Sequence, residues 1–120
     1  MANREILALS LSAQGASVNG NDMENTSCSG AIIVADLTAI SGGNATFTLE
    51  GKDPHSGKYY TILAGAATTI TSTVIMRVNP NIAASANLIA QDMMPRTWRV
   101  NYTRGTSAIT TATVSVILVN

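Results

Sequence analysis

The single histidine of the chain lies in a stretch that also holds an aspartate, a serine and two tyrosines, residues 51–63, GKDPHSGKYYTIL. Serine, histidine and a carboxylate are the residue types of a hydrolytic triad, in which the imidazole takes the hydroxyl proton and the carboxylate orients the imidazole. A triad needs these side chains to converge beside an oxyanion hole. Asp53, His55 and Ser56 are instead packed into one short loop, where they cannot easily orient and bury each other. The sequence therefore predicts no catalytic residue here and no enzyme.

The same residues have the chemistry of a hairpin turn. Pro54 pre-sets the backbone angle of a type I turn, Asp53 can accept an amide two residues on, and Gly57 permits a positive φ. We therefore expect a β-hairpin, with His55 either solvated or in contact with another molecule.

A second candidate is a cation site in the polar stretch 19–29. Asp22 and Glu24 offer carboxylates there, beside several asparagine amides. Calcium needs six or more oxygen ligands in a fixed cage, which a bare polar loop does not supply. We expect an exposed loop and no bound metal.

Trp98 is a third candidate, because Arg96 and Arg99 flank it and such a group can stack on a base or a sugar. Val100 and Tyr102 share its side of a strand, however, which favours burial of the indole. We expect Trp98 in the core, and Arg96 and Arg99 at the surface or against a neighbouring subunit.

The composition limits the kinds of partner. The chain has 120 residues, which suits a single domain spanning 1–120. Seven basic residues balance seven acidic ones, and charged residues make up only 12% of the chain, about half the usual share. This charge pattern gives no footprint for nucleic acid or for an anionic membrane. A surface of Thr, Ser, Asn and Ala suits a subunit of an assembly.

Other features of the sequence point to no cofactor, no secretion and no membrane span. Cys28 is the only cysteine, so it can form no disulfide within the chain, and we expect an inert, buried thiol. The apolar runs 31–35 and 114–119 are far shorter than a membrane span. Polar residues interrupt the N-terminal segment, which therefore lacks the apolar core of a secretion signal.

Apolar and polar residues alternate along most of the chain, as in half-buried strands. The expected strands are 5–12, 31–37, 44–51, 58–63, 69–78, 97–103 and 111–119. Gly42-Gly43 and residues 104–107 are expected to separate strands as turns. Residues 82–91 have apolar positions on one helical face, which leaves a short helix and an irregular crossover both open. The pattern predicts an antiparallel β-sandwich of about seven strands with one short helical crossover, or alternatively a small closed β-barrel.

Two further segments of the chain are GKDPHSGKYYTILAGAA at 51–67 and VIMRVNPNIAASANLIAQDMMPRTWRVNYT at 74–103. Together they resemble a group of small structural proteins encoded in the head gene region of tailed bacteriophages. Those relatives share a G-x-D-P-x-S-G-x-Y-Y-T hairpin, an R-V-x-P segment and an L-P-R-x-W-R-V strand. Met94 stands where leucine is usual in the last motif, a change that conserves volume.

The resemblance implies a virion structural protein, most specifically a β-sandwich decoration or cement protein that binds the major capsid protein. It implies a homo-oligomer, with a trimer expected, located on the capsid surface and made in the host cytoplasm. His55, Tyr59, Arg96 and Arg99 are the residues that we expect at an interface.

Two other roles remain open. A tail- or fibre-associated module would bind a host-surface glycan through exposed aromatics, which requires an exposed Tyr59 or Tyr60 beside Trp98 in an open groove. A head-completion or tail-tube subunit would form rings rather than trimers.

Overall fold

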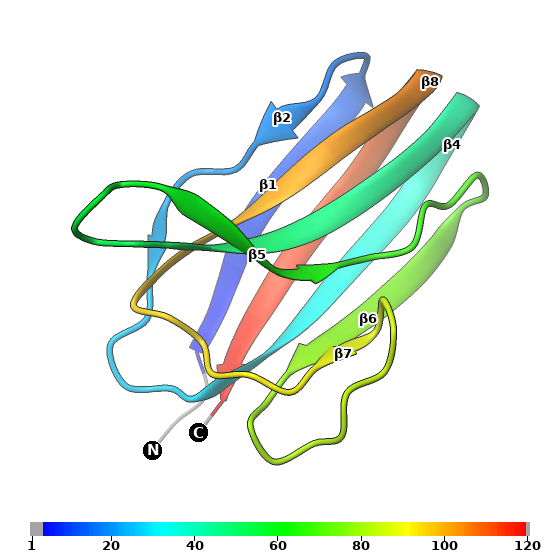
Figure 1. Cartoon of the computed structure of the whole chain (residues 1–120). Helices are drawn as coiled ribbons and strands as arrows, with labels where there is room; N and C mark the ends of the chain where they lie inside the picture. The colour runs from blue at the N-terminus through cyan, green and yellow to red at the C-terminus, as the bar shows by residue number, and fades with distance from the viewer. Residues whose placement is uncertain (1–3, 120) are drawn as a thin grey trace.

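The computed structural model describes residues 4–119, and this part of the chain is built of strands without a helix. The strands are β1 (Arg4–Gln14), β2 (Val18–Asn19), β3 (Met23–Glu24), β4 (Gly30–Lys52), β5 (Tyr59–Ala64), β6 (Ser72–Val78), β7 (Ile89–Ala90) and β8 (Thr97–Val119), as Figure 1 shows. The expected all-β class is confirmed.

The two longest strands, β4 and β8, have 23 residues each and pair with each other from end to end. Their antiparallel ladder runs from the pair Gly30 and Val119 to the pair Gly51 and Trp98. Both strands bend sharply at the same level, so each rises through one layer of the molecule and returns through the other (Figure 1). A single hydrogen-bonded ladder therefore runs through two layers that face each other.

Glycines make this bend possible. Gly42 has a positive φ of 82°, and a Cβ on Gly43 would collide with the carbonyl oxygen of Gly105 on the paired strand. The prediction that Gly42-Gly43 and residues 104–107 separate independent strands is wrong, because β4 and β8 continue through both sites. A glycine can bend a paired strand as readily as it can end one.

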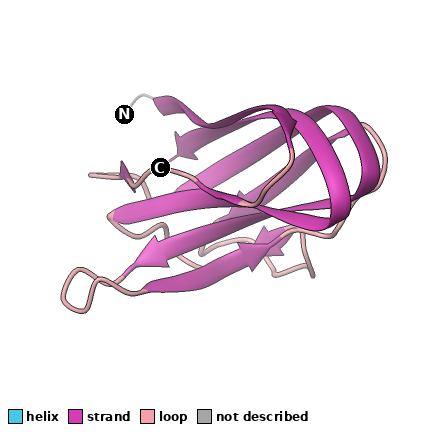
Figure 2. Ribbon diagram, turned by 90° about the horizontal axis from the view of Figure 1, so that it is seen from above, coloured by secondary structure: helices cyan, strands magenta, loops and turns pink. Residues whose placement is uncertain are grey.

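The folded sheet has two halves. The broad half contains β1, β6 and β7 with residues 108–119 of β8 and 30–41 of β4, and the hairpin half contains β2, β3 and β5 with the remaining parts of β8 and β4. β7 runs parallel to β6, so the sheet is mixed, and the path β1-β8-β4-β6-β7 leaves it open. The alternative of a closed barrel is therefore wrong. Figure 2 shows the two halves and the curled end that joins them.

The core lies between the two halves. Ile33 and Val116 enter it from the broad half, and Phe47 and Trp98 enter it from the hairpin half. Trp98 has no exposed surface, and Val100 and Tyr102 are buried beside it on the same side of β8, which confirms the expected burial.

The expected helical crossover at residues 82–91 is also wrong. Turns fill this segment, with a bridge between Ser85 and Ile89, and β7 then pairs with β6. The Asn79 side chain accepts the amide of Asn81 at 2.8 Å, and Asn87 has a positive φ of 63°. The residues from Ala83 to Leu88 are exposed, so no apolar stripe is buried that could stabilise a helix.

Candidate functional site

The predicted hairpin turn forms between β4 and β5, and Asp53 organises it. One carboxylate oxygen of Asp53 accepts the amide of His55 at 3.1 Å, and the other accepts the Ser56 hydroxyl at 2.7 Å. The Ser56 hydroxyl and then the His55 amide hold the pKa of Asp53 below its ordinary value. Gly57 has a φ of 74°, as its place in the turn requires. The serine hydroxyl thus donates to the aspartate, and His55 lies exposed near the tip of the hairpin.

A polar cluster covers the outer side of the hairpin half, and Tyr59 lies at its centre. The guanidinium carbon of Arg99 lies 3.4 Å from the centroid of the Tyr59 ring, which is stacking distance. The Tyr59 hydroxyl donates to Asp22 at 2.7 Å, and Lys52 forms an ion pair with the same carboxylate at 3.0 Å. The cluster therefore ties β4, β5 and β8 to the segment between β2 and β3.

Glu50 extends the cluster along β4. Its carboxylate accepts Arg99 Nε at 2.9 Å and Asn101 Nδ2 at 2.6 Å. The side chains of Arg99 and Glu50 are only 16% and 18% exposed, so this ion pair is better shielded from solvent than the pair of Lys52 with Asp22. We name the surface formed by Asp22, Glu50, Lys52, Tyr59, Arg99 and Asn101 the hairpin face.

Hydrogen bonds favour the charged forms of Asp22 and Lys52 on this surface. The Tyr59 hydroxyl, followed by the Lys52 ammonium, holds the pKa of Asp22 below its ordinary value. The same carboxylate raises the pKa of Lys52. Asp22 therefore serves as a bonded anion within the cluster.

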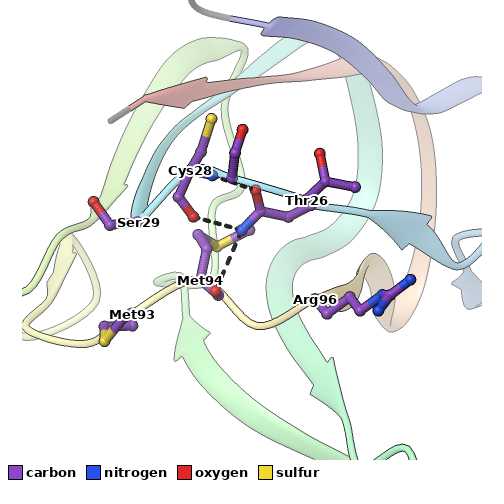
Figure 3. A pocket seen from close by; sticks show the side chains of 8 residues that line it. Thr26, Cys28, Ser29, Met93, Met94 and Arg96 are labelled. Carbon is purple, nitrogen blue, oxygen red and sulfur yellow. Dashed lines mark hydrogen bonds between the residues drawn. The ribbon is translucent and has the colours of Figure 1, made fainter. Parts of the chain in front are cut away.

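Arg96 lines two hollows on the surface. The larger hollow, of about 520 Å³, is shown in Figure 3 and is lined by Asn25, Thr26, Ser27, Cys28, Ser29, Met93, Met94 and Arg96. The second, of about 370 Å³, is lined by Lys52, Asp53, Pro54, Tyr60, Pro95, Arg96 and Thr97. Cys28 is half-buried rather than fully buried as expected.

Asn25 has a structural role that the sequence did not reveal. Its Nδ2 donates to the carbonyl of Cys28 at 2.6 Å and to that of Met94 at 3.3 Å, while its Oδ1 accepts the amide of Cys28 at 2.9 Å (Figure 3). These bonds join the loop before β4 to the segment before β8. Because Met94 lies 69 positions away in the sequence, no local signal identifies this link.

The structure brings together only part of the predicted interface set. Tyr59 and Arg99 are stacked, Arg96 lines both hollows, and His55 lies at the exposed turn. The proposed carbohydrate groove would need Trp98, but that ring is buried, and Arg99 covers the ring of Tyr59. Tyr60 is 47% exposed and packs over Gly51.

The search for a metal site and for a membrane-spanning helix covers residues 4–119. Asp22 is bonded to Lys52 and Tyr59, and this range contains no group of three or more His, Cys, Asp or Glu side chains placed to hold a metal ion. A search of the same range for a helix long and apolar enough to span a membrane finds none.

Comparison of the chain with models of protein families, with curated proteins and with solved structures gives no match.

Proposed function

We propose that this protein is a virion structural protein of a tailed bacteriophage, a β-sandwich capsid decoration or cement protein that binds and stabilises the head shell. The observation that carries the proposal is the direct contact between the hairpin motif and the P-R-x-W-R-V strand, which come from the two resembling segments. Gly51 of the hairpin motif pairs with Trp98 of the P-R-x-W-R-V strand, and Arg99 of that strand stacks on Tyr59 of the hairpin. The two motifs therefore pack against each other, with Trp98 in the core and the Tyr59 and Arg99 contact on the outer side.

The hairpin face supports a binding role because its side chains are already held in place. Binding costs less conformational entropy when interface side chains are ordered beforehand. Arg99, Tyr59 and Glu50 are fixed by their mutual contacts, while His55 and Arg96 are exposed to solvent. We propose that these residues contact the major capsid protein.

The low charge of the chain bears on how this attachment responds to salt. With seven basic and seven acidic residues, and several of those already paired internally, few ion pairs are available to a partner. Because Glu50 and Arg99 already pair with each other, attachment through the hairpin face should rest mainly on hydrogen bonds and on packing against Tyr59, and it should depend little on ionic strength. We propose a homo-oligomer on the capsid surface that contacts neither nucleic acid nor membrane.

The test adds purified protein to particles that lack it, and measures the bound copy number and the temperature at which DNA escapes. We expect hundreds of copies per particle and a higher release temperature. The double variant Tyr59→Ala with Arg99→Ala should bind less, whereas Ser107→Ala, an exposed position at the bend that joins the two halves, should bind normally. Saturation at a few copies, or an unchanged release temperature at full occupancy, would contradict a cement role and favour a tail, fibre or head-completion part.

A further inference from the structure

The outer side of the broad half presents apolar side chains to solvent in an ordered row. Leu7 of β1 pairs with Ser115 of β8, which pairs with Val34 of β4, which pairs with Ile75 of β6. Leu7 is 59% exposed and Ile75 is 42% exposed, so the row has apolar side chains at both of its ends. We name this outward surface of β1, β6 and the intervening parts of β8 and β4 the broad face.

The next row along the strands has apolar side chains between two opposite charges. It runs from Glu5 on β1 through Ile117 and Ile32 to Arg77 on β6. Adjacent strands are about 4.8 Å apart, so three spacings separate the two charges by about 14 Å. This distance is too long for an ion pair, and neither Glu5 nor Arg77 has an ion-pair partner within residues 4–119.

We infer that the broad face binds a second copy of this chain in a two-fold dimer. A two-fold axis along the strands, within the interface, lays β1 of one copy over β6 of the other. Each row then faces the same row of the second copy in reverse order. Glu5 faces the second copy's Arg77, and the reciprocal contact forms at the opposite edge.

The apolar positions match under the same symmetry. Leu7 meets the second copy's Ile75, and Ile32 meets the second copy's Ile117. The third row, Ser10, Thr113, Asp36 and Thr73, is polar throughout and supplies a hydrogen-bonding rim. A single surface that is complementary to itself is what a two-fold interface requires.

The size of the broad face is adequate for a dimer. β1 has 11 residues, which at about 3.3 Å each give a length of about 36 Å, and four strands give a width of about 19 Å. The resulting area of about 700 Å² per copy is close to the roughly 800 Å² per partner of a standard interface. An apolar hollow of about 130 Å³ beside Ile32, Ile82 and Val119 continues the surface at one end.

This inference rests on the sheet alone and holds whether or not the protein attaches to a capsid. It specifies a dimer and a surface, where the resemblance implied only a homo-oligomer and a trimer. The broad face and the hairpin face lie on opposite outer sides of the folded sheet, so one copy can use both.

The first experiment measures the mass of the full chain by sedimentation equilibrium from about 1 to about 100 μM, because interfaces of this size bind in the micromolar range or tighter. We expect the mass to rise to twice the 12.5 kDa of one chain. A monomer throughout this range, or a trimer, would overturn the inference.

Charge exchange provides the specific test. Glu5→Arg and Arg77→Glu should each weaken self-association about tenfold, because two rim pairs change from attraction to repulsion. An equimolar mixture of the two variants should restore the dimer, since each variant then supplies the charge that the other lacks. The double variant Glu5→Arg with Arg77→Glu should also restore it.

Two controls separate the interface from folding. Glu24→Arg reverses an exposed charge on β3, outside the broad face, and should leave the dimer intact. Leu7→Asp changes an exposed position, so its circular dichroism and its melting curve, measured below the concentration of self-association, should match those of the wild type while its dimer is lost. Failure of the mixture to restore the dimer, or equal weakening by Glu24→Arg, would overturn the proposed geometry.

Discussion

The two outer faces of the molecule differ in where their charged groups find partners. On the hairpin face, Asp22 pairs with Lys52 and Glu50 pairs with Arg99, all within one chain. On the broad face, Glu5 and Arg77 lie at opposite edges of one row and have no ion-pair partner within residues 4–119. Charges paired internally stabilise the folded chain, whereas charges held apart on an apolar surface are available to a second molecule.

The same difference appears in the apolar residues. Tyr59 is covered by Arg99 and bonded to Asp22, so its position is set by its own chain. Leu7 on β1 and Ile75 on β6 extend into solvent. We therefore expect changes on the hairpin face to alter the stability of the monomer, and changes on the broad face to alter self-association.

Removal of the core beneath the hairpin face should have the largest effect, because both faces depend on the contact between the two halves. Trp98→Ala should lower the free energy of unfolding by about 3 to 5 kcal/mol, as expected for a buried large-to-small change. Urea denaturation followed by circular dichroism measures this change. Tyr60→Ala, an aromatic truncation at a position that is 47% exposed, is the matched control and should cost much less. Equal losses would mean that the indole is not the main contact between the halves.

The burial of Trp98 illustrates what the sequence can predict. Period-two alternation placed Trp98, Val100 and Tyr102 on one side of a strand, and all three are buried. The sequence also predicts the hairpin turn, because Asp53 accepts a hydrogen bond from an amide two residues on and Gly57 adopts a positive φ. Both inferences needed only neighbours in the sequence.

The remaining features depend on residues that are distant in the sequence. Gly42-Gly43 gives the same local signal for a turn and for a bend, and only the paired Gly105 makes it a bend in a continuous ladder. The stacking of Arg99 on Tyr59 likewise requires the register of three strands. Residues 82–91 had a helical period, but the fold leaves much of that segment exposed and gives it no face to bury.

The ion pairs provide the most direct contrast between the two faces. Arg99→Ala removes the partner of a largely buried Glu50 and should lower the free energy of unfolding by about 1 kcal/mol, more than a typical exposed pair contributes. Arg77→Ala should leave the unfolding free energy within about 0.5 kcal/mol of the wild-type value, measured below the concentration of self-association. Self-association, measured by sedimentation equilibrium, should instead be weakened by Arg77→Ala and unchanged by Arg99→Ala. If both variants lowered the unfolding free energy, or both weakened self-association, the two faces would not have the separate roles proposed for them.

The smallest expected effect concerns the hydrogen bond between Tyr59 and Asp22. The Tyr59 hydroxyl is the largest cause of the lowered pKa of Asp22, so Tyr59→Phe should raise that pKa toward its ordinary value, with Lys52 still holding it partly down. A carboxyl whose pKa is lower in the folded state contributes stability above its unfolded pKa and loses it as the pH falls through the folded pKa. The wild type should therefore exceed the variant in stability most at neutral pH, and this difference should shrink in acid as Asp22 is protonated in both proteins.

Carboxyl carbon NMR titration of Asp22 measures the change directly. His55→Ala is the matched control, because it alters an exposed residue of the same hairpin whose backbone amide, not its imidazole, bonds to Asp53. It should leave the pKa of Asp22 unchanged and the unfolding free energy within about 0.5 kcal/mol of the wild-type value. An Asp22 titration that is the same in Tyr59→Phe as in the wild type would mean that the hydroxyl does not hold this carboxylate in solution. The side chains of the hairpin face would then be held in place by the contacts of Lys52 and Arg99 alone.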